Sequence, residues 1–306
     1  MLTLQGTEQL HMLEKNLVHS FPESLKVYGS VFHINRGNPF NLEVLVDSWP
    51  EFKTVIVRPQ PNDMKDYCDH YTNTYFVYTS DPLTLEEILQ KSDAIDWSQT
   101  LQIQGLQSSI GEVLSGISGS KSFTPDITRT VLYVKDMGIQ NDCGMATEKA
   151  SALETDPFFT TEVKATQQSG VQSSFPVSPL NVSHAELVNE NWAFGGNERS
   201  LRYIQYCIEH FPSLCALGPD GQPVSWSVME QSCEIRMGFT VPEFRRAGLS
   251  RQLLTIFTDF LQQRNIPFYL HVAEENTKAK GVPLGVGFNA SCSWYQWKCI
   301  PIKNCK

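Results

Sequence analysis

The chain has 306 residues, of which 41% are hydrophobic and 19% are charged, and its formal net charge is −9. These values are ordinary for a globular chain that is long enough for two domains. The negative balance argues against nucleic acid as a partner, because such binding rests on neutralising many phosphates. A local basic cluster could still hold one small molecule that carries phosphate.

The eight cysteines form no C-x-x-C pair and have no histidines beside them at zinc spacing, so we expect no metal site. Residues 1–20 lack the apolar segment of a signal peptide, and no apolar run is long enough for a transmembrane segment. We therefore expect an intracellular protein with reduced thiols.

The first half begins with a predicted helix over 7–20, where apolar residues recur at helical intervals. The stretches "SLKVYGSVFHI", "LEVLVDSW" and "KTVIVRP" each predict a strand, with a turn at "INRGNPF". A polar segment with aromatic residues (62–80) precedes helices expected near 83–92 and 104–117 and a strand at 128–136. Residues 138–176 are rich in Ser, Thr, Gln and Gly, which indicates a linker or a long surface excursion.

The second half starts with an extended segment (179–184) and helices near 185–192 and 197–210. Strands follow at "SLCALG", "VSWSVME" and "EIRMGFTV", then a helix over about 248–263 and strands at 267–273 and in "NASCSWYQWKCIPI". Hairpins ahead of a strand–helix–strand unit predict an α/β fold with a mixed, mostly antiparallel sheet flanked by helices. A short echo between "LEKNLVHSFPESLKVYG" and "IQYCIEHFPSLCALG" is either a chance match or the trace of a duplicated architecture.

The stretch "EIRMGFTVPEFRRAGLSRQLL" passes from a strand to a helix. Alternation places Glu234 and Arg236 on the polar face of the strand. Small residues at the start of the helix let a ligand approach the backbone, and free N–H groups, the helix dipole and several arginines favour an anion there. The pattern lacks the fingerprints of dinucleotide and P-loop sites. On its own it is also compatible with a helix whose arginines are only solvated.

This order of parts resembles the GNAT acyltransferase superfamily, whose pyrophosphate loop reads Q/R-x-x-G-x-G/A. More closely, the chain resembles the glycine N-acyltransferase-like proteins. The matching stretches include "FPESLKVYGSVFHINRGNPFNLEVLVDSWPEF", "DHYTNTY", "LQIQGLQ", "LVNENWAFGGNERSLRYI", "GQPVSWSVMEQSCEIRMG" and "WYQWKC". They cover most of the chain outside 138–176.

The resemblance implies a GNAT-type catalytic domain over 178–306, preceded by a second GNAT-like domain over 1–177 that ends in the polar linker. It implies an acyl-CoA co-substrate with no permanently bound cofactor, and glycine or, as the runner-up, glutamine as the acceptor. We expect a monomer in mitochondria by the same resemblance, with the endoplasmic reticulum or cytoplasm as alternatives. A protein that binds acyl-CoA without turning it over remains a second class of function.

Transferred by position, the resemblance assigns the general base to Glu234. It assigns the CoA-binding positions to the backbone of the same strand, the loop and the start of its helix, and a residue after the next strand: Met237, Phe239, Val241, Arg245, Arg246, Ala247, Gly248, Leu249, Ser250 and Asn276. Ser250 departs from the usual Gly or Ala but is still small. Backbone N–H groups between Met237 and Val241 could stabilise the oxyanion of the thioester.

Other residues have simpler interpretations. Glu234 could be a surface residue paired with Arg236, and His271 is more plausible as a core histidine than as a ligand of the acyl site. Cys233 has no partnered histidine in sequence and is expected to be an inert thiol. Arg199 could pair with an amino-acid carboxylate or form a surface salt bridge. The segment "KAKGVPLGVGF" should supply a last helix, but its Gly and Pro residues predict a short or irregular one.

Overall fold

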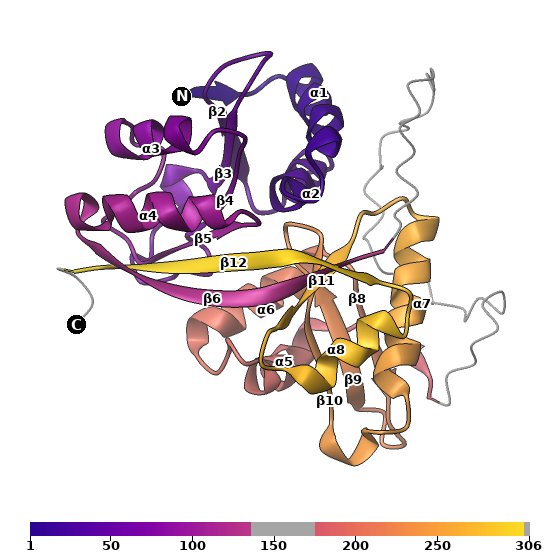
Figure 1. The fold of residues 1–306 in the computed structure, drawn as a ribbon. Coiled ribbons are helices and arrows are strands. Elements are labelled where there is room, and N and C mark those ends of the chain that lie inside the picture. The colour runs from indigo at the N-terminus through magenta and orange to yellow at the C-terminus, as the bar shows by residue number, and fades with distance from the viewer. Residues whose placement is uncertain (136–174, 303–306) are drawn as a thin grey trace, which may run out of the picture.

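The computed structural model describes residues 1–135 and 175–302 (Figure 1). The first half contains β1 (Leu2–Leu4), α1 (Thr7–Leu17), α2 (Leu25–Ile34), β2 (Leu42–Val46), β3 (Thr54–Pro59), β4 (Thr74–Thr79), α3 (Pro82–Lys91), β5 (Leu101–Gly105), α4 (Ser108–Lys121) and β6 (Phe123–Val134). The second contains β7 (Val177–Ser178), α5 (Ala185–Asn191), α6 (Glu198–His210), β8 (Ser213–Leu217), β9 (Pro223–Met229), β10 (Glu234–Thr240), α7 (Leu249–Gln263), β11 (Tyr269–Ala273), α8 (Thr277–Leu284) and β12 (Asn289–Pro301). Short 3₁₀ turns lie at Val18–Ser20, Pro61–Asp63, Val182–His184 and Pro242–Phe244.

The two halves repeat one order of elements: a strand, two helices, three strands, a helix, a strand, a helix and a strand. The architecture is therefore duplicated, but the echo in the sequence is not its trace, because it aligns elements that are not equivalent. It matched the segment that forms α1 with the segment that forms α6, whereas α6 occupies the position of α2.

The segment "SLKVYGSVFHI" was predicted to be a strand, and this prediction was wrong because it forms α2. Every residue from Leu25 to Phe32 is buried. A helix that is covered on all sides loses the polar stripe that normally reveals its 3.6-residue period, and its β-branched and aromatic residues then resemble a buried strand.

Strands β1, β4 and β5 were missed and one helix was shifted. Strand β4 lies inside the segment described only as polar and aromatic. Strand β5 takes the start of the helix predicted at 104–117, which instead begins at Ser108. The strand or extended segment expected at 179–184 was wrong in its second part, where a 3₁₀ turn forms at Val182–His184. The other predicted helices and strands overlap the elements that form. The linker predicted at 138–176 lies almost entirely outside the described residues.

All twelve strands form one sheet, in the order β1-β2-β3-β4-β5-β12-β6-β11-β10-β9-β8-β7. The pairs β4–β5 and β10–β11 are parallel, and the other neighbouring pairs are antiparallel. The predicted fold class, a mixed and mostly antiparallel sheet flanked by helices, is confirmed.

The last strand of each half lies in the sheet of the other half. Strand β6 lies between β12 and β11, and β12 pairs with β5 on its opposite edge. Figure 1 shows these two long strands side by side where the halves meet. A division of the chain at residue 177 stays a proposal, and any such division separates strands that are neighbours in the sheet.

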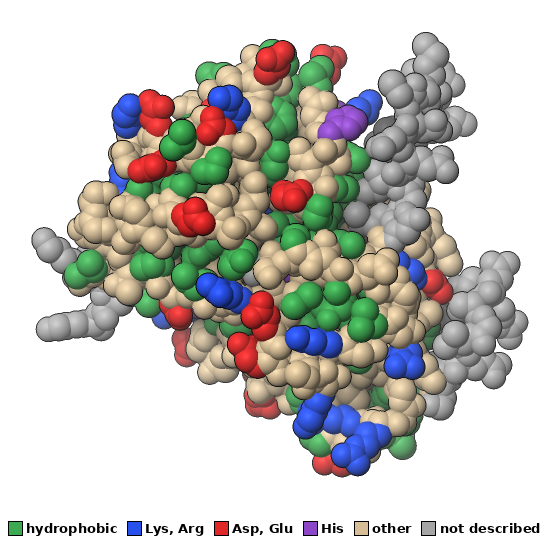
Figure 2. Space-filling model, in the orientation of Figure 1, with side chains coloured by type: hydrophobic (Ala, Val, Ile, Leu, Met, Phe, Trp, Pro, Cys, Tyr) green, Lys and Arg blue, Asp and Glu red, His purple; other side chains and the backbone are tan. Residues whose placement is uncertain are grey.

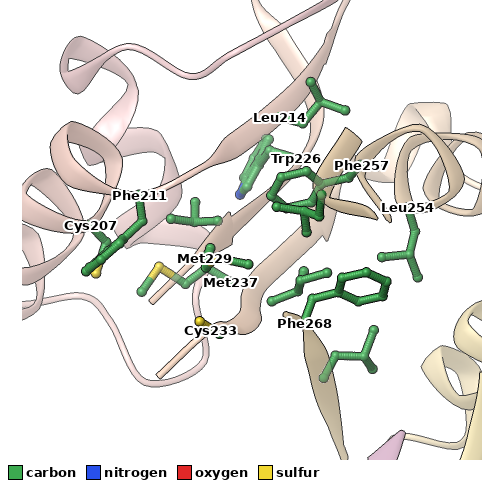
Figure 3. Packing of buried hydrophobic residues seen from close by; sticks show 14 of the residues in the cluster. Cys207, Phe211, Leu214, Trp226, Met229, Cys233, Met237, Leu254, Phe257 and Phe268 are labelled. Carbon is green, nitrogen blue, oxygen red and sulfur yellow. The ribbon is translucent and has the colours of Figure 1, made fainter. Parts of the chain in front are cut away.

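The hydrophobic core has three clusters. One packs α3 and α4 against a face of the first half's sheet, and another packs α1 and α2 against the opposite face. The third fills the second half and includes residues of α6, α7 and the strands between them, among them Met229, Met237 and Phe257 (Figure 3). Within the described ranges, no helix combines the length and the apolar character needed to cross a membrane.

Candidate active site

Strands β10 and β11 pair only at their beginnings. The parallel register joins Glu234 to Tyr269 and Ile235 to Leu270 and then stops. On its other edge, β10 bulges away from β9 between Arg236 and Phe239. Met237 lies in this bulge with a φ of 55°, an uncommon value for a residue that is not glycine. Met237 and Gly238 therefore have no register partner on either neighbouring strand, and this interruption of the ladder is where we expect an extended ligand to approach the backbone.

One predicted donor on this strand is excluded. The N–H of Val241 donates to the carbonyl of Val224 at 2.9 Å. Val241 can thus line the CoA path but cannot also supply an N–H to the oxyanion, which leaves Met237 and Gly238 as better candidates.

The loop after β10 has the shape of an anion site. Gly248 precedes the first turn of α7 with a φ of +76°, a left-handed conformation that favours glycine. Residues 245–248 are exposed, and Leu249 is buried behind them. Figure 2 shows lysine and arginine side chains gathered at the lower end of the molecule, over this turn. The N–H groups that begin α7 and these cations attract the same negatively charged ligand.

Two side chains fix the loop to the strand. The Nε of Arg245 donates to the Thr240 carbonyl at 2.8 Å, and the guanidinium lies 5.2 Å from the Phe239 ring. The hydroxyls of Ser250 and Thr240 are 2.7 Å apart. Serine at position 250, where the resembling loop usually has Gly or Ala, thus adds a hydrogen bond that neither of those residues could make. Arg246 and Ala247, with no such bond, are the exposed tip of the loop.

Glu234 is buried, with only 2% of its surface exposed, so its interpretation as a surface residue was wrong. One carboxylate oxygen accepts a hydrogen bond from Lys26 Nζ, and the other lies 2.9 Å from His271 Nδ1 and 3.6 Å from Arg236 Nε. The carboxylate therefore sits where β10 and β11 begin to part, held by three basic side chains.

Lys26 reaches this site from α2, in the other half of the chain. Its ammonium group also donates to Glu230 Oε1 at 2.9 Å and to Ser232 Oγ at 3.1 Å. The approach depends on Gly29, because a Cβ at this position would lie 1.8 Å from the carbonyl oxygen of Ser232. Helix α2 thus packs directly against the turn between β9 and β10.

Glu230 is the second buried carboxylate of the site. Besides Lys26, it accepts hydrogen bonds from Arg236 Nη1 at 2.8 Å, Tyr203 Oη at 2.9 Å and Ser232 Oγ at 2.5 Å. Two carboxylates thus face two cations in a buried cluster, as the cost of burying charge requires.

This balance sets the protonation of the site. Burial acts to raise the pKa of Glu234, but the positive charges of Lys26 and Arg236, together with the contact of His271, outweigh it and hold the pKa well below its usual range. The pKa of Glu230 is also lowered. Burial acts to raise it, but the charges of Lys26 and Arg236 outweigh that effect. Burial lowers the pKa of His271 although Glu234 opposes this shift. At neutral pH both carboxylates are ionised and the imidazole is neutral.

The sequence reasoning missed Lys26 and Glu230 and gave too little weight to His271. A lysine inside the apolar run "SLKVYG" was the available signal, because a buried lysine needs an acidic partner. The partner lies 208 positions away, so the pairing itself could not be found from local pattern.

The remaining candidates have local roles in the structure. Asn276 caps α8 by accepting from the N–H of Ala279 at 3.2 Å. Arg199 forms a surface ion pair with Asp66 at 2.8 Å. The Cys233 thiol donates to the Gly29 carbonyl, and burial raises its pKa well above the usual value, which supports an inert thiol. Helix α8 spans only eight residues with Pro283 inside it, as its composition predicted.

Comparison with known families identifies this arrangement. Residues 1–212 match the family described as aralkyl acyl-CoA:amino acid N-acyltransferase, and residues 214–301 match the C-terminal region of the same family. The chain belongs to this family. It is therefore an acyltransferase of the aralkyl acyl-CoA:amino acid N-acyltransferase family, with acyl-CoA as its co-substrate and an amino acid as the acyl acceptor.

Several family members match over nearly their whole length. Human glycine N-acyltransferase-like protein 2 is 46% identical over 306 residues, with 100% of both chains covered. Bovine glycine N-phenylacetyltransferase is 45% identical, and human glycine N-acyltransferase is 43% identical, each covering 99% of this chain and 100% of its own. Among solved structures, a Drosophila protein covers 99% of both chains with a TM-score of 0.72 and 14% identity, which shows a shared fold.

Proposed function

We propose that this family member transfers the acyl group of an acyl-CoA to the amine of glycine, giving an N-acylglycine and free CoA. Glutamine is the alternative acceptor. Support for glycine comes from the names of relatives at 42–46% identity, which include glycine N-acyltransferases of human, bovine, rat and mouse origin. The same family membership leads us to propose mitochondria as the compartment.

The observation that carries the proposal is the position of the Glu234 carboxylate. It lies at the start of the parting between β10 and β11, on the strand that leads directly to the basic turn before α7. A CoA diphosphate held at that turn, with Asn276 beside it at the start of α8, would extend its thioester along the free backbone of β10. The thioester carbonyl would then lie near Met237 and Glu234.

The reaction we propose needs no covalent enzyme intermediate. The amine nitrogen attacks the thioester carbonyl carbon, and Glu234 takes the proton that the amine must lose, directly or through one water. The N–H groups at Met237 and Gly238 stabilise the negative oxygen of the tetrahedral intermediate. Its collapse breaks the C–S bond, and the CoA thiolate leaves and is protonated from solvent.

The basic neighbours of Glu234 have opposing effects on this role. They keep the carboxylate ionised and ready to accept a proton, but a low pKa makes it a weak base. Glu234 would therefore hold the proton only transiently. His271, at 2.9 Å and neutral, fixes the orientation of the carboxylate by facing it with Nδ1.

One assay tests the proposal: release of free CoA thiol from benzoyl-CoA and from oleoyl-CoA, each with glycine, glutamine or no acceptor. We expect release that depends on glycine. Glu234→Gln keeps the shape of the side chain and should lower kcat about 100-fold or more at neutral pH, the range for loss of a general base. Partial recovery at high pH, where more of the amine is already neutral, would support the role.

Two results would contradict the proposal. Binding of acyl-CoA with no thiol release under any acceptor would indicate a protein that holds acyl-CoA without using it. Full activity in Glu234→Gln would remove this residue from the mechanism, whatever the acceptor. Glu186→Gln is the matched control. Glu186 is exposed on α5 and does not belong to the Glu234 cluster, so this variant should leave kcat unchanged.

A further inference from the structure

A small cavity lies where the two halves meet, next to the Glu234 cluster. His70, Tyr71 and Gln102 line it from the first half, and Trp192, Phe194, Tyr203, Arg236 and Gln296 line it from the second. Arg236 joins it to the reaction site, because its Nε lies 3.6 Å from Glu234 Oε1. The mechanism above gives this cavity no role.

One end of the cavity is polar and carries a positive charge. Arg236 uses Nη1 for Glu230 at 2.8 Å, while its Nη2 has only a long contact of 3.5 Å with Gln296 Oε1. The Nε2 of Gln296 donates to Gln102 Oε1 at 2.6 Å, which fixes the amide in place. Nη2 is thus the least engaged donor of a guanidinium whose planar fork is suited to carboxylates.

The rest of the wall is aromatic and tightly arranged. The guanidinium of Arg236 lies 5.5 Å from the Trp192 ring and 6.0 Å from the Phe194 ring. Tyr71 packs on Tyr203 at 5.8 Å and donates its hydroxyl proton to the Phe194 carbonyl, so this wall is tied across both halves. The enclosed space is about that of one water molecule. One oxygen of a carboxylate can take up that space beside Arg236, and there is no room for a bulky side chain.

The charges also suit a particular kind of ligand. Lys26 and Arg236 balance Glu230 and Glu234, so a ligand with net charge would leave an uncompensated charge in a buried cluster. An α-amino acid is a zwitterion whose two charged groups are separated by one carbon. Arg236 and Glu234 lie two residues apart on the same strand and offer charges of the opposite signs side by side.

We propose that this cavity binds the carboxylate of the acceptor amino acid through Arg236 and Gln296, and that its aromatic wall limits the acceptor to glycine. The amine of the same molecule then points to Glu234. The inference rests on the proposed function and adds to it a location for the acceptor and a physical reason for selecting the smallest amino acid.

Steady-state kinetics of two variants test the proposal. Gln296→Leu keeps the volume but removes the amide that aligns Arg236, and we expect the KM for glycine to rise about tenfold, as for a lost hydrogen bond to a charged group. The KM for acyl-CoA should not change.

The second variant, Phe194→Ala, opens the aromatic wall of the cavity. Phe194 is 37% exposed and lies outside the core clusters. The ratio of kcat/KM for alanine to that for glycine should rise about tenfold, which is the discrimination that a pocket typically achieves for one methylene group.

Gln104→Leu is the matched control. Gln104 lies on β5 two residues beyond Gln102, is buried, and its side-chain amide has no hydrogen bond to any described residue. It does not line the cavity, so the KM for glycine should stay at the wild-type value. Circular dichroism and thermal unfolding of each variant establish that it is folded.

Two outcomes would overturn the inference. In the first, Gln296→Leu and Phe194→Ala change the KM for acyl-CoA or the preference between benzoyl-CoA and oleoyl-CoA and leave glycine unaffected, which would make the cavity an acyl pocket. In the second, both variants behave as wild type. Calorimetric binding of glycine in the presence of CoA separates this inference from the proposed function: binding that Gln296→Leu abolishes supports the site even if turnover is absent.

Discussion

At the scale of single residues, the lysine of α2 has the largest influence on the site. Lys26 donates to both buried carboxylates, so its ammonium group offsets much of their negative charge. Replacing it by methionine keeps the length of the side chain and removes the charge. Glu234 would then keep only Arg236 and His271 as basic neighbours, and its pKa would rise toward that of an ordinary or buried carboxyl group.

We therefore predict that Lys26→Met makes acyl transfer more sensitive to acid. The wild type should keep its kcat/KM at pH values well below neutral, because Glu234 stays ionised there. In the variant, protonation of Glu234 should begin at higher pH, and we expect the acid limb of the kcat/KM profile to move to higher pH than in the wild type. The pH profile of kcat/KM measures this shift.

A control separates this effect from general destabilisation. Lys15→Met removes an exposed lysine from α1 and should leave the profile unchanged. A uniform loss of activity in Lys26→Met at all pH values, with no shift of the acid limb, would show that the lysine supports the fold and does not set the charge of Glu234.

The residues of the site differ in how far sequence could reveal them. Glu234 and the loop at 245–250 follow from alternation and from a glycine with arginines at a helix start, both of which are local signals. Two partners of Glu234 come from elements distant in sequence, Lys26 from α2 and His271 from β11. No local period records such contacts, so Lys26 and Glu230 emerged only from the packing.

At the scale of elements, the contact between α2 and the β9–β10 turn controls whether Lys26 can reach Glu234. Gly29→Ala would place a Cβ 1.8 Å from the Ser232 oxygen and 2.5 Å from its carbonyl carbon. Both are backbone atoms, so the helix or the turn must move. We predict a loss of about 1–3 kcal/mol in the free energy of unfolding, the usual cost of overpacking, and a fall in kcat.

Gly116→Ala in α4 is the matched control for this prediction. A Cβ at Gly116 meets no atom within 4 Å. In a helix interior, alanine is favoured over glycine by about 0.5–1 kcal/mol, so this variant should be slightly more stable and fully active. Urea unfolding measures both variants. Equal stability of Gly29→Ala and the wild type would contradict the close packing described for α2.

The elements also show where sequence patterns stop being informative. Amphipathic helices such as α6 and α7 were found because they have one polar face. Helix α2 has none over most of its length, and strand β4 is buried along all six residues in a segment that otherwise looks polar. Burial on all sides removes the alternation on which such predictions depend.

At the scale of the whole molecule, acid should weaken the folded state through His33. Burial, aided by the charge of Arg36, lowers the pKa of His33 to about 3, against about 6.5 in an unfolded chain. The unfolded state therefore binds this proton first, and stability falls as the pH drops below about 6.5 toward 3.

We predict that His33→Gln flattens this dependence, measured as the free energy of unfolding between pH 7 and pH 5. His11→Gln, at an exposed site, is the control and should not change it. An unchanged slope in His33→Gln would contradict a buried neutral imidazole.

The shared sheet gives a further prediction for the whole chain. Strand β12 pairs with β5 and β6, so neither half has its complete sheet alone. Co-expressed fragments 1–177 and 178–306 should copurify, and each expressed separately should associate or aggregate through its unpaired strand edges. Size-exclusion chromatography with light scattering measures this. Two soluble, monomeric fragments without affinity for each other would contradict it.

The crossing of β6 and β12 also has a consequence for biosynthesis. Because β12 (Asn289–Pro301) follows β5 and β6 by more than a hundred residues in the chain, the edges of β5 and β6 stay open until this segment has emerged from the ribosome. The part of the sheet where β12 joins β5 to β6 can thus close only after residues 289–301 have been made. A chain that stops between β6 and β12 would expose the unpaired edges of β5 and β6, which would make it a target for chaperones and proteases.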